Sequence, residues 1–260
     1  MKLRLQNITL SFTGGKDSFK ILNGLSLDVP TAKITALIGG NGSGKTTLFN
    51  IISGFQKGYS GKVIFDDKEI NNLSPSQIAK QGVGRLFQGK LLVQDLTLLE
   101  NMLLASNDNS GEIPFVYLFQ KKKIDRKEKE KEQQAIDVLN RLFGENNKYV
   151  GMLHHKGSDF SYGEQRLISL ARLFMGNYSL LLLDEPTAGV NPVYIDNIKN
   201  IIWQMIADGK TTVLLIEHNM QFIDGVAHHC AFVDSGAIQF QGTAEEVLSN
   251  QDVRNSYLGL

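Results

Sequence analysis

Gly39–Thr47 reads G-G-N-G-S-G-K-T-T and has the spacing G-x-x-x-x-G-K-[ST]. The stretch follows an apolar run, Ile34–Ile38, and precedes a helical pattern of apolar residues through Leu48, Ile51 and Ile52. A strand, a glycine-rich loop and a helix start in this order are the context in which the spacing forms a phosphate-binding loop. We therefore predict that a P-loop domain of the α/β class is built around this stretch.

The residue types in the loop suit an anion. Glycines permit backbone conformations that are closed to residues with a Cβ, so successive N–H groups can point inward at a helix N-terminus. Lys45 is expected to reach the β- and γ-phosphates, and the hydroxyl of Thr46 is expected to ligate Mg²⁺. A glycine turn without a ligand is the structural alternative. The predicted nucleotide contacts are Gly39, Asn41, Gly42, Ser43, Gly44, Lys45, Thr46 and Thr47.

Charge and cysteine content narrow the class of protein. The 260 residues contain 27 Lys plus Arg and 27 Asp plus Glu, and this balance gives no reason to expect a nucleic-acid partner. The single cysteine, Cys230, excludes an intramolecular disulfide and is expected to be a buried small hydrophobe. The N-terminus lacks a signal-peptide core, and no apolar run reaches the length of a membrane span. Any role at a membrane is therefore expected to depend on a partner.

The order of patterns predicts the architecture. Alternating apolar residues at 2–12 and 22–29, with a turn at 13–17, predict an antiparallel β-layer. After residue 34 strands alternate with helices, which predicts a mainly parallel core sheet with helices on both faces.

The pattern changes after Gln88 to helices, at 96–105 with Thr97 and Glu100 as a capping box, and at 135–143. The charged stretch 121–134 is interpreted as a solvated helix face, with contact to lipid headgroups as the alternative. We expect one domain over residues 1–260, with a nucleotide-binding core at 1–88 and 166–260 and an inserted helical subdomain at 89–165.

Polar residues follow three of the predicted strands. Asp184 and Glu185 end the apolar run Leu180–Leu183, where Asp184 can hold the Mg²⁺ shell and Glu185 can orient or deprotonate the attacking water. Gln88 follows a strand at 83–87 and can reach a metal ion or water at the carboxyl edge of the sheet. His218 ends a strand at 212–216; such a histidine is usually structural, but here it can face the γ-phosphate and hold the geometry of Glu185 and water.

A second anion site is predicted at F-S-Y-G-E-Q, residues 160–165, directly before a helix at 167–175. Ser161 and the backbone of Gly163 would lie at the helix N-terminus, where anions bind. A simple helix cap is the alternative. Because the chain has one phosphate loop, a second anion site suggests that the phosphate belongs to a second subunit.

Over essentially the whole chain, these motifs resemble the ATP-binding subunit of an ATP-binding-cassette (ABC) transporter. The phosphate loop matches Walker A, Gln88 the Q-loop, residues 160–165 the signature, L-L-L-L-D-E Walker B, A-G-V-N the D-loop and His218 the switch histidine. The resemblance implies an ATP- and Mg²⁺-dependent hydrolase that forms a head-to-tail dimer with a copy or a homologue. Two ATP molecules would lie between Walker A of one subunit and the signature of the other, including Ser161, Gly163 and Gln165.

The resemblance also implies a place and partners. The subunit would lie in the cytoplasm on the inner face of the cell membrane, bound to transmembrane permease subunits through the region 88–105. An aromatic ring should stack on adenine, and Phe12 is the predicted residue, with Phe19 as the alternative. The chain departs from the family pattern at Tyr162, where a glycine is usual, at Phe160, where leucine is usual, and at Asn191, where aspartate is common.

Four stretches are similar to the branched-chain amino acid type of importer ATPase, which includes urea and amide relatives: residues 87–105, the charged insertion before Ala135, D-E-P-T-A-G-V-N-P, and the C-terminal S-Y-L-G. This implies transport of a small polar solute that a separate solute-binding protein delivers to the permease. The rival is a soluble cassette ATPase that acts on ribosomes or DNA, but such chains usually carry two cassettes or a long coiled coil. A third alternative, a P-loop kinase, is not favoured, because the signature and His218 would then have no function.

Overall fold

The structure is a computed structural model that describes residues 1–14, 17–89, 91–105 and 114–258. Its contacts divide the chain into two compact units. The first unit comprises Met1–Gln88, Tyr178–Ala188 and Ile202–Leu260, and the second comprises Gly89–Asn177 and Gly189–Ile201. Residues 107–111 are polar, a pattern that predicts a loop, and they lie outside the described residues.

A six-stranded sheet forms the centre of the first unit, in the order β10-β9-β3-β8-β7-β6. All neighbours from β9 to β6 are parallel, and β10 is the one antiparallel strand, at the edge. The predicted mainly parallel core is thus confirmed. Parallel strands end at one edge of a sheet, so the loops after β3, β6, β7 and β8 meet there. The strands are β3 Ile34–Ile38, β6 Val83–Leu86, β7 Leu180–Asp184, β8 Thr212–Ile216, β9 His229–Asp234 and β10 Ala237–Thr243.

The predicted antiparallel layer is a four-stranded sheet in the order β2-β1-β4-β5, also in the first unit. Its strands are β1 Leu3–Gly14, β2 Asp17–Val29, β4 Ser60–Phe65 and β5 Lys68–Glu69. The first two strands are longer than predicted, because Phe12 pairs with Phe19 and the pairing continues to Gly14 and Asp17. The predicted turn at 13–17 was therefore too wide.

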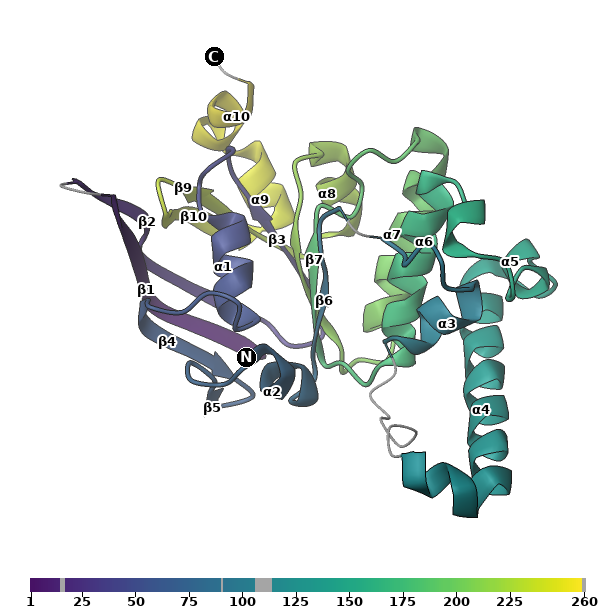
Figure 1. The fold of residues 1–260 in the computed structure, drawn as a ribbon. Helices are drawn as coiled ribbons and strands as arrows, with labels where there is room; N and C mark the ends of the chain where they lie inside the picture. The colour runs from purple at the N-terminus through teal and green to yellow at the C-terminus, as the bar shows by residue number, and fades with distance from the viewer. Residues whose placement is uncertain (15–16, 90, 106–113, 259–260) are drawn as a thin grey trace. The chain divides into compact units, whose positions relative to one another are not determined.

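Helix α1 (Lys45–Ile52) lies between these two sheets, as Figure 1 shows. Its buried residues, among them Leu48 and Phe49, belong to one apolar cluster with residues of both sheets, such as Leu5 and Leu182. This packing fixes the helix whose N-terminus carries the phosphate loop. Cys230 on β9 is buried as predicted, and burial raises the pKa of its thiol to about 12. The other helices assigned wholly to this unit are α2 Pro75–Lys80, α8 Met220–Val226, α9 Ala244–Ser249 and α10 Gln251–Leu258.

The second unit is helical, with its own apolar core that includes Met102, Leu139, Phe160 and Ile168. The predicted capping box of Thr97 and Glu100 is present at the start of α3. The helix predicted at 135–143 is the end of the longer α4, and the one predicted at 167–175 begins at Tyr162. The elements are α3 Leu98–Leu103, α4 Pro114–Phe143, α5 Lys148–Gly151, η1 Gly157–Asp159, α6 Tyr162–Ala171, η2 Arg172–Met175 and η3 Pro192–Tyr194. Helix α7, Ile195–Ile206, begins in this unit and ends in the first.

Across the ranges that the structure describes, no helix combines the length and apolar character that crossing a membrane requires.

Candidate functional site

The loop between β3 and α1 needs glycine at two positions for steric reasons. Gly39 has φ 154°, and a Cβ on it would lie 2.1 Å from the carbonyl oxygen of Val233 on β9. Gly44 has φ 102°, and a Cβ there would lie 2.7 Å from Cδ2 of Leu22. Gly44 is also the N-cap of α1 and has no side chain with which to cap the helix. No N-cap side chain therefore bonds to the N–H groups of the first turn, and N–H groups at a helix N-terminus can bind an anion.

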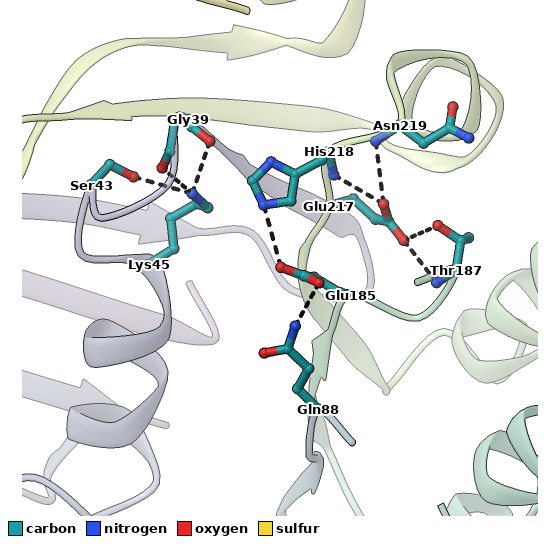
Figure 2. A network of polar contacts seen from close by, with 10 residues as sticks. Gly39, Ser43, Lys45, Gln88, Glu185, Thr187, Glu217, His218 and Asn219 are labelled. Carbon is teal, nitrogen blue, oxygen red and sulfur yellow. Dashed lines mark hydrogen bonds and ion pairs between the residues drawn. The ribbon is translucent and has the colours of Figure 1, made fainter. Parts of the chain in front are cut away.

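Lys45 is buried in this loop. Its Nζ donates to the carbonyl oxygens of Gly39 and Gly40, both at 2.8 Å, and to Oγ of Ser43 at 3.2 Å (Figure 2). Burial lowers the pKa of Lys45, and the nearby carboxylates of Glu185 and Asp184 partly oppose that shift. The ammonium group is thus held by the same loop that is predicted to bind phosphate.

A cavity of about 310 Å³ lies over the loop in the first unit. It brings the predicted loop contacts, except Gly39, together with Glu185 and His218, which follow β7 and β8. Its lining residues are Ile21, Asn41, Gly42, Ser43, Gly44, Lys45, Thr46, Thr47, Glu185 and His218. The cavity contains a positively charged side chain, Lys45, and a carboxylate, Glu185.

Glu185 is the centre of a group of polar side chains. Gln88 Nε2 donates to its Oε2 at 2.7 Å, and His218 Nε2 lies 3.3 Å from its Oε1 (Figure 2). The backbone of Glu185 has φ 46°, an uncommon value for a residue with a side chain, and such residues cluster at functional sites. Its N–H donates to the carbonyl oxygen of Ile216 at 2.9 Å. Glu185 thus contacts both of the other residues predicted to act on water.

Asp184 has a partner that the sequence did not reveal. Nη2 of Arg85, on the neighbouring strand β6, lies 3.4 Å from its Oδ2. Nη1 of Arg85 also donates to Asn50 Oδ1 at 2.8 Å and to Ser53 Oγ at 2.7 Å, at the C-terminal end of α1. The signal that could have identified Arg85 is a charge inside the short apolar strand V-G-R-L-F.

The residues predicted to hold Mg²⁺ supply oxygen atoms only: the hydroxyl of Thr46, the carboxylate of Asp184 and the amide of Gln88. Hard cations prefer such ligands, and Mg²⁺ usually keeps water and substrate phosphates beside one or two carboxylates. Among the described residues no cluster of three or more His, Cys, Asp or Glu side chains could hold a metal alone. The donor set therefore fits Mg²⁺ that arrives with a nucleotide.

The aromatic residues predicted to stack on adenine, Phe12 or Phe19, lie in the antiparallel sheet. Phe12 and Phe19 are 49% and 69% exposed and pair across β1 and β2. Of the side chains that the structure describes, the cavity is lined on this side by Ile21 and by neither phenylalanine. The stacking role of Phe12 stays a prediction.

The signature residues lie in the second unit, where Ser161 is the N-cap of α6. Ser161 Oγ donates to Glu164 Oε2 at 2.7 Å, and Glu164 also pairs with Lys148. Gln165 Nε2 donates to the carbonyl oxygen of Phe160 at 2.7 Å, and its Oε1 accepts from Gln94 at 3.1 Å. These local bonds order the start of α6. Contacts of Ser161, Gly163 and Gln165 with a nucleotide stay a prediction.

Gly163 has a packing role in this unit. A Cβ on Gly163 would lie 2.5 Å from the ring of Tyr194, so the ring packs directly on the glycine backbone. Tyr162, the unusual signature residue, is exposed, whereas Phe160 is buried in the helical core. Asn191 accepts a hydrogen bond from the N–H of Val193 and caps η3. Two of the departures from the family pattern, Phe160 and Asn191, thus have local structural roles.

A phosphate loop between β3 and α1, with carboxylates at the end of β7 and a histidine at the end of β8, defines a P-loop nucleoside-triphosphatase. Residues 22–188 match the family model described as ABC transporter. The chain is 33% identical over 257 residues to the high-affinity branched-chain amino acid transport ATP-binding protein BraF of Pseudomonas aeruginosa, covering 99% of this chain and 97% of that one. The chain belongs to the ABC transporter family and is an ABC-type ATPase.

Two further comparisons agree with this assignment. A probable branched-chain amino acid transport ATP-binding protein LivG of Methanocaldococcus jannaschii is 36% identical over 261 residues, covering 99% of this chain and 97% of that one. The solved ADP conformation of an ATP-binding cassette from an ABC transporter has a TM-score of 0.81 and 33% identity, covering 100% of this chain and 99% of that one. The predicted resemblance to the branched-chain amino acid type is confirmed.

Proposed function

We propose that this chain hydrolyses ATP to energise the transport of a small polar solute through separate permease subunits. The observation that carries the proposal is the cavity in which the phosphate loop, Glu185 and His218 meet. Branched-chain amino acids are the first solutes to test, because relatives of 33% and 36% identity are named for their transport. Urea and small amides are the next. The chain would act on the cytoplasmic face of the membrane, held there by its permease.

Binding of the triphosphate would use the loop and the start of α1. The ammonium group of Lys45 would exchange some of its bonds to Gly39, Gly40 and Ser43 for phosphate oxygens. Thr46 and Asp184, with Gln88, would hold Mg²⁺, which when bound supplies positive charge to the phosphate oxygens. Catalysis of this kind depends on positioning and charge neutralisation and needs no covalent intermediate on the protein.

Hydrolysis would use the group around Glu185. Its carboxylate would accept a proton from, or orient, the water that attacks the γ-phosphate. Gln88 and His218 contact its two oxygens and restrict its rotation. Because both contacts come from the ends of neighbouring strands, the carboxylate is fixed before substrate binds.

A second cassette subunit would complete the site. Ser161 and Gly163 lie at the N-terminus of the ten-residue helix α6, where N–H groups and the helix dipole favour an anion. In a head-to-tail dimer this helix would face the ATP bound by the other subunit. The partner is a copy of this chain or a homologue.

The test begins with the purified chain. We expect ATP binding by calorimetry in the presence of Mg²⁺ and release of phosphate, with binding lost in Lys45→Ala. Failure of the intact, folded chain to bind ATP would overturn the proposal.

Transport is tested separately. We expect affinity capture from membranes of the source cell to recover a multi-span permease, and proteoliposomes that contain the complex and its solute-binding protein to accumulate leucine with ATP inside. Uptake of urea in place of leucine would reassign the solute. Recovery of ribosomal particles without a permease would overturn the transport role.

A further inference from the structure

A buried carboxylate lies directly before His218. Glu217 is the first residue after β8, and only 3% of its surface is exposed. It is absent from the predicted site. A buried carboxylate is costly unless hydrogen-bond donors surround it, so its contacts indicate what it does.

Both oxygens of Glu217 accept hydrogen bonds (Figure 2). Oε1 accepts from the N–H of Thr187 at 2.9 Å and from its hydroxyl at 2.5 Å. Oε2 accepts from the N–H groups of His218 at 2.9 Å and Asn219 at 3.3 Å. Four donors from two separate segments of the chain thus converge on one side chain.

These two segments carry Glu185 and His218, the groups that are proposed to act on water. Thr187 lies two residues after Glu185, and His218 follows Glu217 directly. The segments also meet where the Glu185 N–H donates to the Ile216 carbonyl oxygen, and where His218 Nε2 approaches Glu185 Oε1 at 3.3 Å. The two segments are therefore joined at two places: by Glu217, which binds the backbone of both, and by the contact between the side chains of Glu185 and His218.

An amide of the same shape could not make these contacts. Glutamine has one acceptor oxygen, and its NH₂ group would face either the donors of Thr187 or the N–H groups of His218 and Asn219. The hydrogen bonds from one of the two segments would then be lost, while the volume of the side chain would stay the same. Two acceptor oxygens are therefore needed at this position.

We infer that Glu217 is a positioning residue for ATP hydrolysis, which acts by holding the backbone of His218 and the loop after Glu185 so that the imidazole faces the Glu185 carboxylate. The inference rests on the proposed hydrolysis of ATP. Glu217 is not among the residues that line the cavity over the phosphate loop, so its loss should affect turnover rather than affinity.

The first test compares Glu217→Gln with Glu246→Gln. Glu246 is a matched control, because its carboxylate also accepts a backbone N–H bond, from Thr243, but does so at the start of α9. We expect Glu217→Gln to lower kcat by about 10- to 100-fold, the usual effect of losing a hydrogen bond that orients a site residue, with KM for ATP nearly unchanged. We expect Glu246→Gln to leave kcat as in the parent. An equal kcat in both variants would overturn the inference.

The second test asks whether Glu217 acts through His218. In a His218→Ala background, measured by single-turnover phosphate release, adding Glu217→Gln should reduce the rate less than twofold. The same factor in both backgrounds would show that Glu217 acts elsewhere and would overturn the inference. If the parent itself bound no ATP, the proposed function would fail, which is a different result.

The third test applies if Glu217→Gln does not fold, and it changes Thr187 instead. Thr187→Val keeps the shape and the N–H of Thr187 but removes the hydroxyl, whereas Thr187→Ser keeps the hydroxyl. We expect Thr187→Val to lower kcat with KM unchanged, and Thr187→Ser to restore the parent value. Parent kcat in Thr187→Val, with Glu217→Gln unfolded, would leave Glu217 a stabilising residue only and would overturn the inference.

Discussion

Arg85 and Asp184 form an ion pair across the neighbouring parallel strands β6 and β7, with side chains only 6% and 1% exposed. The same guanidinium bonds to α1, so it joins the predicted magnesium ligand to the helix that follows the phosphate loop. Removing one member of a buried pair leaves an uncompensated charge, which is far more costly than losing a surface pair.

We therefore expect Arg85→Met to lower the free energy of unfolding by about 3–5 kcal/mol, measured by urea denaturation. Arg4→Met, which breaks the exposed pair with Asp67, should cost less than about 1 kcal/mol. Adding Asp184→Asn to Arg85→Met should recover part of the loss. No recovery in the double variant would show that the arginine stabilises the protein through its other contacts, such as those with Asn50 and Ser53, and not through the charge of Asp184.

Glu185→Gln should retain ATP but hydrolyse it slowly. The amide keeps the size of the side chain, but it has one acceptor oxygen where the carboxylate has two, and it cannot accept a proton from water. We expect kcat to fall by about 10²- to 10⁴-fold and an ATP-bound dimer to accumulate in size-exclusion chromatography. Glu245→Gln on α9 is the control. Hydrolysis at the parent rate by Glu185→Gln would remove Glu185 from the mechanism.

Lys45→Ala should lose nucleotide binding and keep its fold. The ammonium group lies among the carbonyl oxygens of the phosphate loop, where no other lysine or arginine lines the cavity among the described residues. We expect no heat of ATP binding in calorimetry and a melting temperature close to that of the parent. Lys62→Ala, at an exposed site on β4, should bind ATP normally. Undiminished binding by Lys45→Ala would contradict the phosphate-loop assignment.

Gly163→Ala should destabilise the second unit through Tyr194. Alanine normally favours a helix over glycine, but here the added methyl group would lie 2.5 Å from the aromatic ring. We expect a loss of about 1–3 kcal/mol in urea denaturation, typical of overpacking. In a Tyr194→Ala background the same substitution should be neutral or stabilising. Equal losses in both backgrounds would exclude the ring as the cause.

Stability should depend on Glu164 in the acid range. Burial raises the pKa of Glu164, but the bonds from Lys148 and Ser161 outweigh it and hold the pKa below its ordinary value of 4.5. A depressed carboxyl pKa stabilises the fold above the unfolded value, and that contribution is lost as pH falls through the folded pKa. The parent should therefore melt higher than Glu164→Gln at pH 6, with the difference shrinking below about pH 4.5. A constant difference across this range would contradict the assignment.

The parts of this fold that were predictable depend on short-range patterns. The phosphate loop, the capping box at Thr97 and the carboxylates after Leu180–Leu183 each occupy a few consecutive residues with a fixed spacing. Gln88, Glu185 and His218 could also be placed together, because parallel strands deliver their following residues to one edge.

Long-range side-chain pairing was not predictable from the sequence. Glu217 directly precedes a predicted site residue, and Arg85 pairs with another in the folded chain. No pattern in the neighbouring sequence, however, indicates that Arg85 contacts Asn50 or that Glu217 contacts Thr187. The packing of Tyr194 on Gly163 joins residues 31 positions apart, and only the folded chain brings them together. The lengths of β1 and β2 were likewise fixed by cross-strand pairing rather than by local turn residues.

The state of Cys230 has a practical consequence for measuring motion in this protein. The only thiol of the chain is buried and, with a pKa of about 12, stays protonated at neutral pH, where thiolate is the form that reacts with maleimides. Cys230 should therefore react very little with thiol-specific fluorophores or spin labels. A pair of engineered cysteines, one in each unit, would report distance changes during ATP turnover without removal of the native residue.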